Sequence, residues 1–178
     1  MRKRGYKVSP QSEKGIVERA VQIREMVKGL CKGNFVMIIH LLEVLHYNDV
    51  LYLEVCDDSE AERKGEAFFN PSTRTITLPD SVYCAVCEGQ GRARFTVAHE
   101  IAHFFLGHSL VFGRNGDSDW KPYVDSEWQA DTFASAFLAP PYLIDIHKSA
   151  DQIASEFGLS IQAAKIALEK TKKARPKA

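Results

Sequence analysis

The stretch that decides the fold of this chain is RFTVAHEIAHFFLGH, residues 94–108. The chain contains neither Gly nor Pro from residue 92 until Gly107, and its apolar residues from Phe95 to Phe105 recur at helical spacing. We therefore predict an amphipathic helix over residues 92–107, with the polar letters H-E-x-x-H on it.

On this helix His99 and His103 lie one turn apart on the same face, so both can offer an imidazole nitrogen to one metal ion. Glu100 lies beside the first histidine and is placed to act on a water at that ion rather than to bind the ion. A catalytic zinc ion takes three protein ligands and lowers the pKa of its water from about 15.7 toward 7. Glu100 would accept the water's proton and pass it to the leaving amine. A third ligand must therefore exist elsewhere.

A third histidine in the arrangement H-E-x-x-H-x-x-G-x-x-H is excluded, because Leu106 and Ser109 stand where Gly and His are needed. His108 follows His103 by five residues and lies well round the helix from the metal-facing side, so we do not expect it to be a ligand. The other common solution is a glutamate from a second helix. The segment SEWQADTFASAF provides one, Glu127.

Asp131 follows Glu127 by one helical turn on the same face, where it can accept a hydrogen bond from the outer nitrogen of a ligand histidine. The 23 residues between His103 and Glu127 leave room for a loop and a returning helix. If both histidines were instead ordinary core residues, Glu100 and Glu127 would need buried partners of their own, which is costly for carboxylates. We therefore predict a zinc site with His99, His103 and Glu127 as ligands.

The rest of the chain predicts an α+β fold, mainly helical, with a small antiparallel β-sheet. The predicted helices run from residue 12 to about 29, from 34 to 46, from 125 to 138, and as two short helices joined at FGLS near residue 158. The predicted strands are VLYLEV and the hairpin EAFFNPSTRTITL, which turns at NPST.

The bulk composition is that of an ordinary globular protein, with 45% hydrophobic and 26% charged residues in 178. We predict a basic N-terminal tail over residues 1–11, a metallopeptidase-like domain over 12–148, and a helical subregion packed on it over 149–178. No apolar run approaches the roughly 18 residues of a membrane span. The start of the chain does not have the pattern of a secretory signal, so we expect a cytoplasmic protein.

Three features allow more than one interpretation. The 23 Lys and Arg balance the 23 Asp and Glu, but basic residues gather at both tips, as solvated ends or as phosphate contacts. Cys84 and Cys87 form a C-x-x-C that we interpret as free, partly buried thiols rather than a zinc knuckle, because no second close pair exists. Residues 149–170 have a helix-turn-helix outline, but their second segment is short of base-reading side chains, which favours two packing helices.

RFTVAHEIAHFFLGH followed by EWQADTFASAFLAP resembles the ImmA/IrrE metallopeptidase family, whose members carry R-F-T-x-A-H-E-x-x-H and then E-x-x-A-[ND]-x-F-A-x-x-L-x-x-P. VERAVQIREMV, IIHLLEVL, TRTITLPD and IASEFGLSIQAAKIAL fall where that family has comparable elements. The resemblance implies a zincin-like domain with Zn²⁺ held by His99, His103 and Glu127, and with Glu100 as general base. Asp131 stands where the family often has Asn or Asp. The ending FLAPP departs from the more usual Leu-Met-Pro.

The resemblance also implies a stand-alone peptidase or antirepressor that cleaves or inactivates an Xre-type helix-turn-helix repressor, encoded by an adjacent gene of a mobile element, such as a prophage, or of a stress response. Two alternatives are an antirepressor that only binds its partner and the toxin of a toxin–antitoxin module. Neither nucleic acid nor membrane binding is expected. No residue clearly matches the histidine or tyrosine that stabilises a transition state. The candidates by position alone are His108, Tyr123, Tyr142 and His147.

Overall fold

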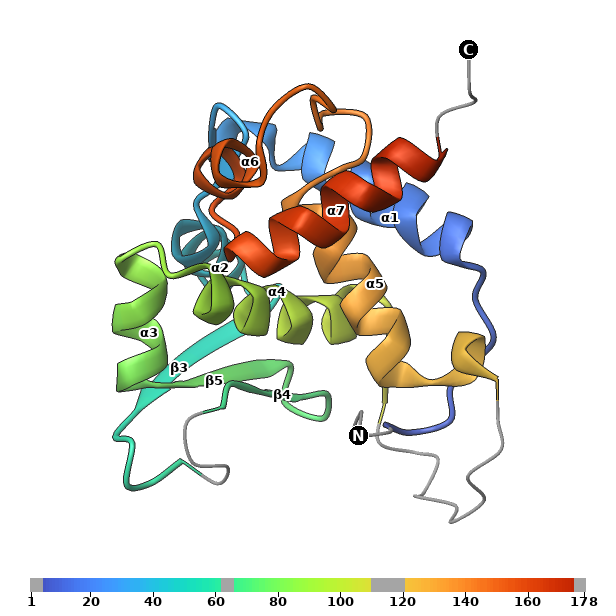
Figure 1. Cartoon of the computed structure of the whole chain (residues 1–178). Coiled ribbons are helices and arrows are strands. Elements are labelled where there is room, and N and C mark those ends of the chain that lie inside the picture. Colours follow the sequence, from blue (N-terminus) through green and yellow to red (C-terminus); the bar gives the residue numbers. More distant parts are fainter. Residues whose placement is uncertain (1–4, 62–65, 110–120, 175–178) are drawn as a thin grey trace.

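The computed structural model describes residues 5–61, 66–109 and 121–174. Helix α4 (Gly91–Phe105) runs through the middle of the molecule (Figure 1), and the predicted helix is confirmed. Its apolar face is buried, with Val97 and Ile101 fully inaccessible to solvent. The helix ends before Gly107, whose positive φ of 69° is the left-handed conformation common just after a helix C-terminus.

Helix α5 (Ser126–Leu138) packs between α4 and α1 (Glu13–Met26). The aromatic rings of Phe105, Phe133 and Phe137 stack in succession along the α4–α5 contact. Arg24 of α1 is buried and donates hydrogen bonds to the carbonyl oxygens of Phe137 and Leu138, at the C-terminal end of α5. A cation at that end complements the helix dipole, so α5 is fixed in place beside α4.

Below α4 in Figure 1 lies a three-stranded sheet with the order β3-β5-β4. The predicted hairpin is confirmed, because β4 and β5 are antiparallel with Phe69 opposite Ile76. The prediction of a wholly antiparallel sheet is wrong, since β3 pairs with β5 in parallel, with Leu53 opposite Ile76. Ile76 and Leu78 make β5 the most buried strand, so it takes the central place between β3 and β4. The strands are β3 (Tyr52–Cys56), β4 (Phe68–Asn70) and β5 (Thr75–Pro79).

Shorter elements complete the core. The second helix begins later than predicted, because residues 35–36 pair with residues 31–32 in a small antiparallel ladder. A helix that the sequence analysis did not predict follows β5 and carries Cys84 and Cys87. Both thiols are free, but the prediction that they are partly buried is wrong, because both are exposed. Neither belongs to a metal-binding group among the described residues. These elements are η1 (Lys28–Leu30), β1 (Cys31–Lys32), β2 (Phe35–Val36), α2 (Ile38–Tyr47), α3 (Asp80–Cys87) and η2 (Pro122–Val124).

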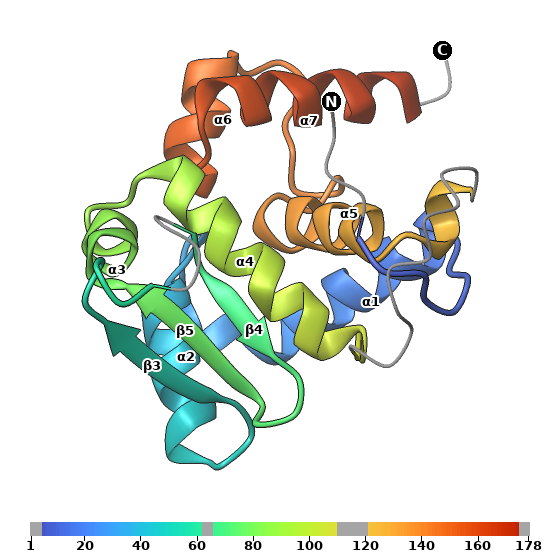
Figure 2. The same cartoon turned by 90° about the horizontal axis from the view of Figure 1, so that it is seen from below.

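The C-terminal helices α6 (Ala150–Phe157) and α7 (Ile161–Ala174) lie on the opposite side of α4 from the sheet, as Figures 1 and 2 both show. Arg94 of α4 joins them to the domain. Its guanidinium lies 3.6 Å from the centre of the Phe35 ring, and its Nε donates to the carbonyl oxygen of Gly158 at 2.9 Å. Gly158 has a φ of 67°, and a Cβ there would meet the Phe35 ring at 2.4 Å, so the turn between α6 and α7 requires glycine.

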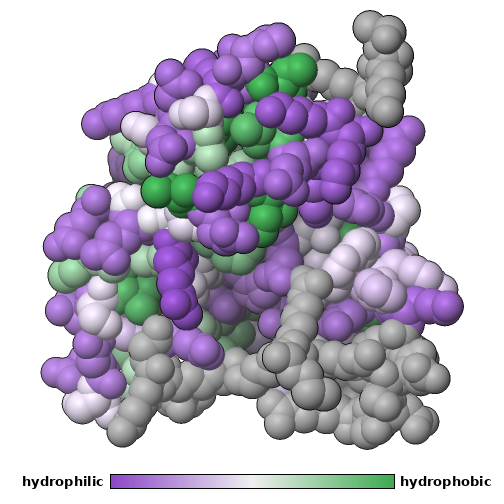
Figure 3. Space-filling model, in the orientation of Figure 1, coloured by the Kyte–Doolittle hydropathy of each residue, from purple (hydrophilic) through white to green (hydrophobic). Residues whose placement is uncertain are grey.

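The face of the molecule in Figure 3 is mostly hydrophilic, with small apolar areas beside α7. Within the described ranges, no helix has the length and apolar character to cross a membrane. Of the basic residues predicted at the tips, Lys170 and Lys172 are exposed on α7, and Lys170 pairs with Glu13 at 3.7 Å. Several others lie outside the described residues, namely Arg2, Lys3, Arg4, Arg175 and Lys177.

Candidate metal centre

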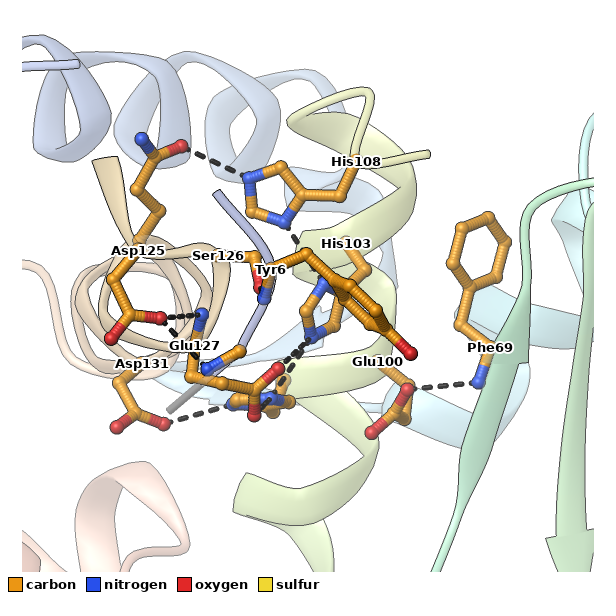
Figure 4. A network of polar contacts seen from close by, with 12 residues as sticks. Tyr6, Phe69, Glu100, His103, His108, Asp125, Ser126, Glu127 and Asp131 are labelled. Atoms are coloured by element: carbon orange, nitrogen blue, oxygen red, sulfur yellow. Dashed lines mark hydrogen bonds and ion pairs between the residues drawn. The ribbon is translucent and has the colours of Figure 1, made fainter. Parts of the chain in front are cut away.

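Two helices bring the three predicted metal ligands together. His99 and His103 both lie on α4. Glu127 projects toward His103 from the first turn of α5 (Figure 4). Asp125 caps α5 by accepting a hydrogen bond from the N–H of Glu127 at 3.0 Å, which fixes where the helix begins. The ligand atoms of the three side chains all lie within 4.8 Å of one another.

The spacing of these atoms is compatible with one bound metal ion. Zn–N and Zn–O distances of about 2.0–2.1 Å at tetrahedral angles place neighbouring ligand atoms about 3.3–3.4 Å apart. The Nε2 atoms of His99 and His103 are 3.1 Å apart. Oε2 of Glu127 lies 3.3 Å from Nε2 of His99, and the other carboxylate oxygen, Oε1, lies 3.6 Å from Nε2 of His103. The two imidazole nitrogens and the two oxygens of the carboxylate therefore face one another at distances that a single metal ion could bridge.

The outer nitrogen of His99 is held by a carboxylate. Nδ1 of His99 donates to Oδ1 of Asp131 at 2.9 Å, as the E-x-x-x-D spacing predicts. Burial opposes protonation of this imidazole, but the hydrogen bonds to Asp131 and Glu127 outweigh it and raise the pKa of His99 to about 10. Because Asp131 fixes a proton on Nδ1, the nitrogen that faces the centre is the one a metal ion would bind.

His103 is oriented by a different device, a chain of neutral groups. The side-chain nitrogen of Gln129 donates to the carbonyl oxygens of Ser9 and Tyr123, so its Oε1 is the acceptor that faces His108. His108 then donates from Nε2 to Gln129 at 3.0 Å and keeps Nδ1 as an acceptor. Nδ1 of His103 donates to that atom at 2.9 Å, which leaves a lone pair on Nε2.

The charge states of His103 and His108 agree with this chain of hydrogen bonds. Burial lowers the pKa of His108, and burial together with the nearby charges of His99 and His108 lowers the pKa of His103 to about 3. Both imidazoles are therefore neutral at pH 7. Burial works against ionisation of Glu127, but its hydrogen bond to His99 and its neighbouring charges give it a lowered pKa, so it is a carboxylate. His103 therefore offers a lone pair and Glu127 an anion, and His99 offers a second lone pair once a cation displaces its Nε2 proton, which together make the donor set of a divalent cation.

Glu100 lies on the sheet side of this group (Figure 4). The backbone N–H of Phe69 in β4 donates to its Oε2 at 2.9 Å. Glu100 and the three ligands line one cavity of about 300 Å³, together with Phe68, Phe69 and Pro71. The side chain predicted as a general base therefore faces the same space as the metal ligands while the sheet edge anchors it.

A sequence model of the M78 peptidase family, described as the IrrE N-terminal-like domain, matches residues 63–169, which is more than half of the chain. The chain belongs to the M78 family. No curated protein matches this M78 chain. Among solved structures, a Mycobacterium tuberculosis transcriptional regulator is similar in fold, with a TM-score of 0.54 at 17% identity. The alignment covers 91% of the M78 chain and 48% of the regulator, so the chain spans about half the length of that protein.

The M78 cavity has a wall that sequence reasoning missed. The segment predicted as a basic tail is hydrogen-bonded to the chain before α5, where the N–H of Val8 donates to the carbonyl oxygen of Val124 at 2.9 Å. Tyr6 and Val8 line the cavity. The signal available in the sequence was the alternation of Tyr6 and Val8 with Lys7, which is typical of a short strand with one inward face.

Of the four residues proposed by position as transition-state stabilisers, only His108 lines this M78 cavity. Tyr123 is 47% exposed, and the hydroxyl of Tyr142 donates to Glu25 on α1. His147 is exposed in the loop before α6. Gln129, which sequence reasoning did not single out, is completely buried and positions His108.

Proposed function

We propose that this protein is a zinc-dependent endopeptidase. The observation that carries the proposal is the convergence of His99, His103 and Glu127, whose ligand atoms all lie within 4.8 Å of one another, with Glu100 lining the same cavity. Two imidazoles and one carboxylate form the ligand set of the thermolysin type of zinc peptidase. Membership of the M78 family agrees with this assignment.

His99, His103 and Glu127 would hold the ion, and zinc held there supplies a Lewis acid that makes water nucleophilic near neutral pH. Glu100 accepts a proton from the attacking water as the new C–O bond forms at the peptide carbonyl. It then gives that proton to the amide nitrogen as the C–N bond breaks, which releases an amine and a carboxylic acid. The Phe69 N–H holds Glu100 at the sheet edge during both transfers.

We further propose that the substrate is an Xre-type helix-turn-helix repressor encoded by an adjacent gene, and that cleavage in the cytoplasm relieves repression. This partner follows from the resemblance of both metal motifs to the ImmA/IrrE family. Specificity would come from protein contacts outside the cavity of about 300 Å³, which accommodates only the residues next to the scissile bond.

The test incubates the zinc-loaded full chain with that repressor and follows fragments by mass spectrometry. Glu100→Gln should keep one zinc per chain and lose about 10²–10⁴-fold in cleavage rate, because the proton acceptor is gone. Glu169→Gln, on the exposed face of α7, is the matched control and should cut at the normal rate.

Cleavage that survives in Glu100→Gln would refute the mechanism. A wild-type protein that holds zinc and relieves repression without producing fragments would instead identify a binding antirepressor. The same mass spectra and a metal analysis of the same sample separate these results.

A further inference from the structure

The N-terminal wall of the cavity, residues Gly5–Val8, is built into the fold. The N–H of Tyr6 donates to Oγ of Ser126 at 2.9 Å, and the N–H of Ser126 donates back to the carbonyl oxygen of Tyr6 at 3.0 Å. The N–H of Gly5 donates to the Asp125 carboxylate at 3.1 Å, and Lys7 pairs with Asp125 as an antiparallel bridge. The N-terminal wall is therefore tied to the residues that begin α5.

This attachment places the N-terminal wall directly against a metal ligand. A Cβ on Gly5 would lie 2.1 Å from Oγ of Ser126 and 2.6 Å from Cγ of Glu127, so only glycine at this position allows the N-terminal wall to lie so close to Glu127. Because side chains alternate along an extended segment, Tyr6 is directed to the cavity while Lys7 is exposed. In Figure 4 the ring of Tyr6 extends across the view of His103, with its hydroxyl on the side of Glu100 and Phe69.

Attack of water on a peptide carbonyl converts the carbonyl oxygen into an oxyanion, which needs a hydrogen-bond donor besides the metal ion. We propose that the phenol O–H of Tyr6 is this donor, an inference that rests on the proposed peptidase function. The phenol donates a hydrogen bond and keeps its proton, so the water's proton still passes only through Glu100. Tyr6 is thereby a catalytic residue of the candidate site.

The other side chains that line the cavity are less suited to this role. Both ring nitrogens of His108 are engaged, one with His103 and one with Gln129. The hydroxyl of Ser126 accepts the N–H of Tyr6 and is 1% exposed. Ser109 also lines the cavity and carries a hydroxyl, so a loss of phosphoryl affinity in Ser109→Ala but not in Tyr6→Phe would assign the role to Ser109 and overturn the proposal.

The test compares two small ligands on the zinc-loaded full chain by calorimetry. N-phosphoryl-leucyl-tryptophan presents a tetrahedral anion that imitates the oxyanion. Acetohydroxamic acid binds the metal ion through a planar group. Tyr6→Phe, which removes only the hydroxyl, should weaken the phosphoryl ligand about tenfold or more and leave the hydroxamate within about twofold, because a hydrogen bond to a charged group is lost. Tyr47→Phe removes the hydroxyl of an exposed tyrosine on α2, outside this cavity, and should change neither affinity.

With the repressor as substrate, Tyr6→Phe should lower kcat about 10²–10³-fold with KM and zinc content unchanged. Equal phosphoryl affinity in the wild-type and Tyr6→Phe proteins would overturn the proposal. So would hydroxamate binding without phosphoryl binding in the wild type, since the site would then lack an oxyanion donor. A protein that binds neither ligand and no zinc would overturn the proposed function itself.

Discussion

The neutral chain from Gln129 through His108 to His103 gives a prediction that can be worked out in numbers. His108→Ala removes the acceptor for Nδ1–H of His103, whose side chain is only 14% exposed. An unsatisfied buried donor costs about 1–3 kcal/mol, which corresponds to roughly 5–150-fold in an equilibrium constant. Partners that orient a metal-binding histidine are worth about 10–100-fold in metal affinity. We therefore expect His108→Ala to weaken zinc binding about 10–100-fold.

The assay is competition for zinc against a chelator of known affinity, with folding checked by circular dichroism. His108→Asn places an oxygen near the position of Nδ1 and should recover most of the affinity. His147→Ala removes an exposed histidine and is the matched control, for which no change is expected. A folded His108→Ala protein that binds zinc within about threefold of the wild type would refute the assignment of this chain of hydrogen bonds.

Three further predictions follow from the same geometry. Because the pKa of His99 is raised to about 10 while that of His103 is lowered to about 3, zinc at pH 7 must displace about one proton, from His99. Calorimetry in buffers of different ionisation enthalpy should measure this proton release, and binding without proton release would contradict the raised pKa of His99. For the same reason, zinc affinity should fall as the pH falls. Gly5→Ala should displace the N-terminal wall and lower cleavage by about 10²-fold, since a shift of about 1 Å near reacting groups costs that much; an unchanged rate would show that the wall is not needed. Arg94→Ala should lower the free energy of unfolding, measured with denaturant, by about 2–4 kcal/mol, because its hydrogen bonds to two buried carbonyl oxygens and its stacking on Phe35 are lost. A loss under about 1 kcal/mol would mean that the attachment of α6 and α7 does not depend on Arg94.

Local patterns in the sequence were sufficient to predict those features that depend on a single helix. The 3.6-residue repeat places His99 and His103 on one face whatever surrounds them, and it does the same for Glu127 and Asp131. The helix boundaries at Asp125 and Gly107 also follow from local chemistry, a capping carboxylate and a left-handed glycine. For this reason the candidate ligands and the main helices could be predicted from the sequence.

Contacts between distant segments were decided by the tertiary structure. Strand β5 takes the centre of the sheet because it buries Ile76 and Leu78, and no local pattern states which neighbour it pairs with in parallel. Likewise Tyr6 meets Ser126 across 120 positions of sequence, and Gln129 reaches His108 only because α5 packs on α4. The sequence by itself determined that His99 shares a helix face with His103 and Glu127 with Asp131, since backbone periodicity fixes the spacing within each pair, whereas packing of α5 on α4 decided that the two pairs meet. Only packing decided what surrounds those side chains, because it depends on which apolar faces are buried together.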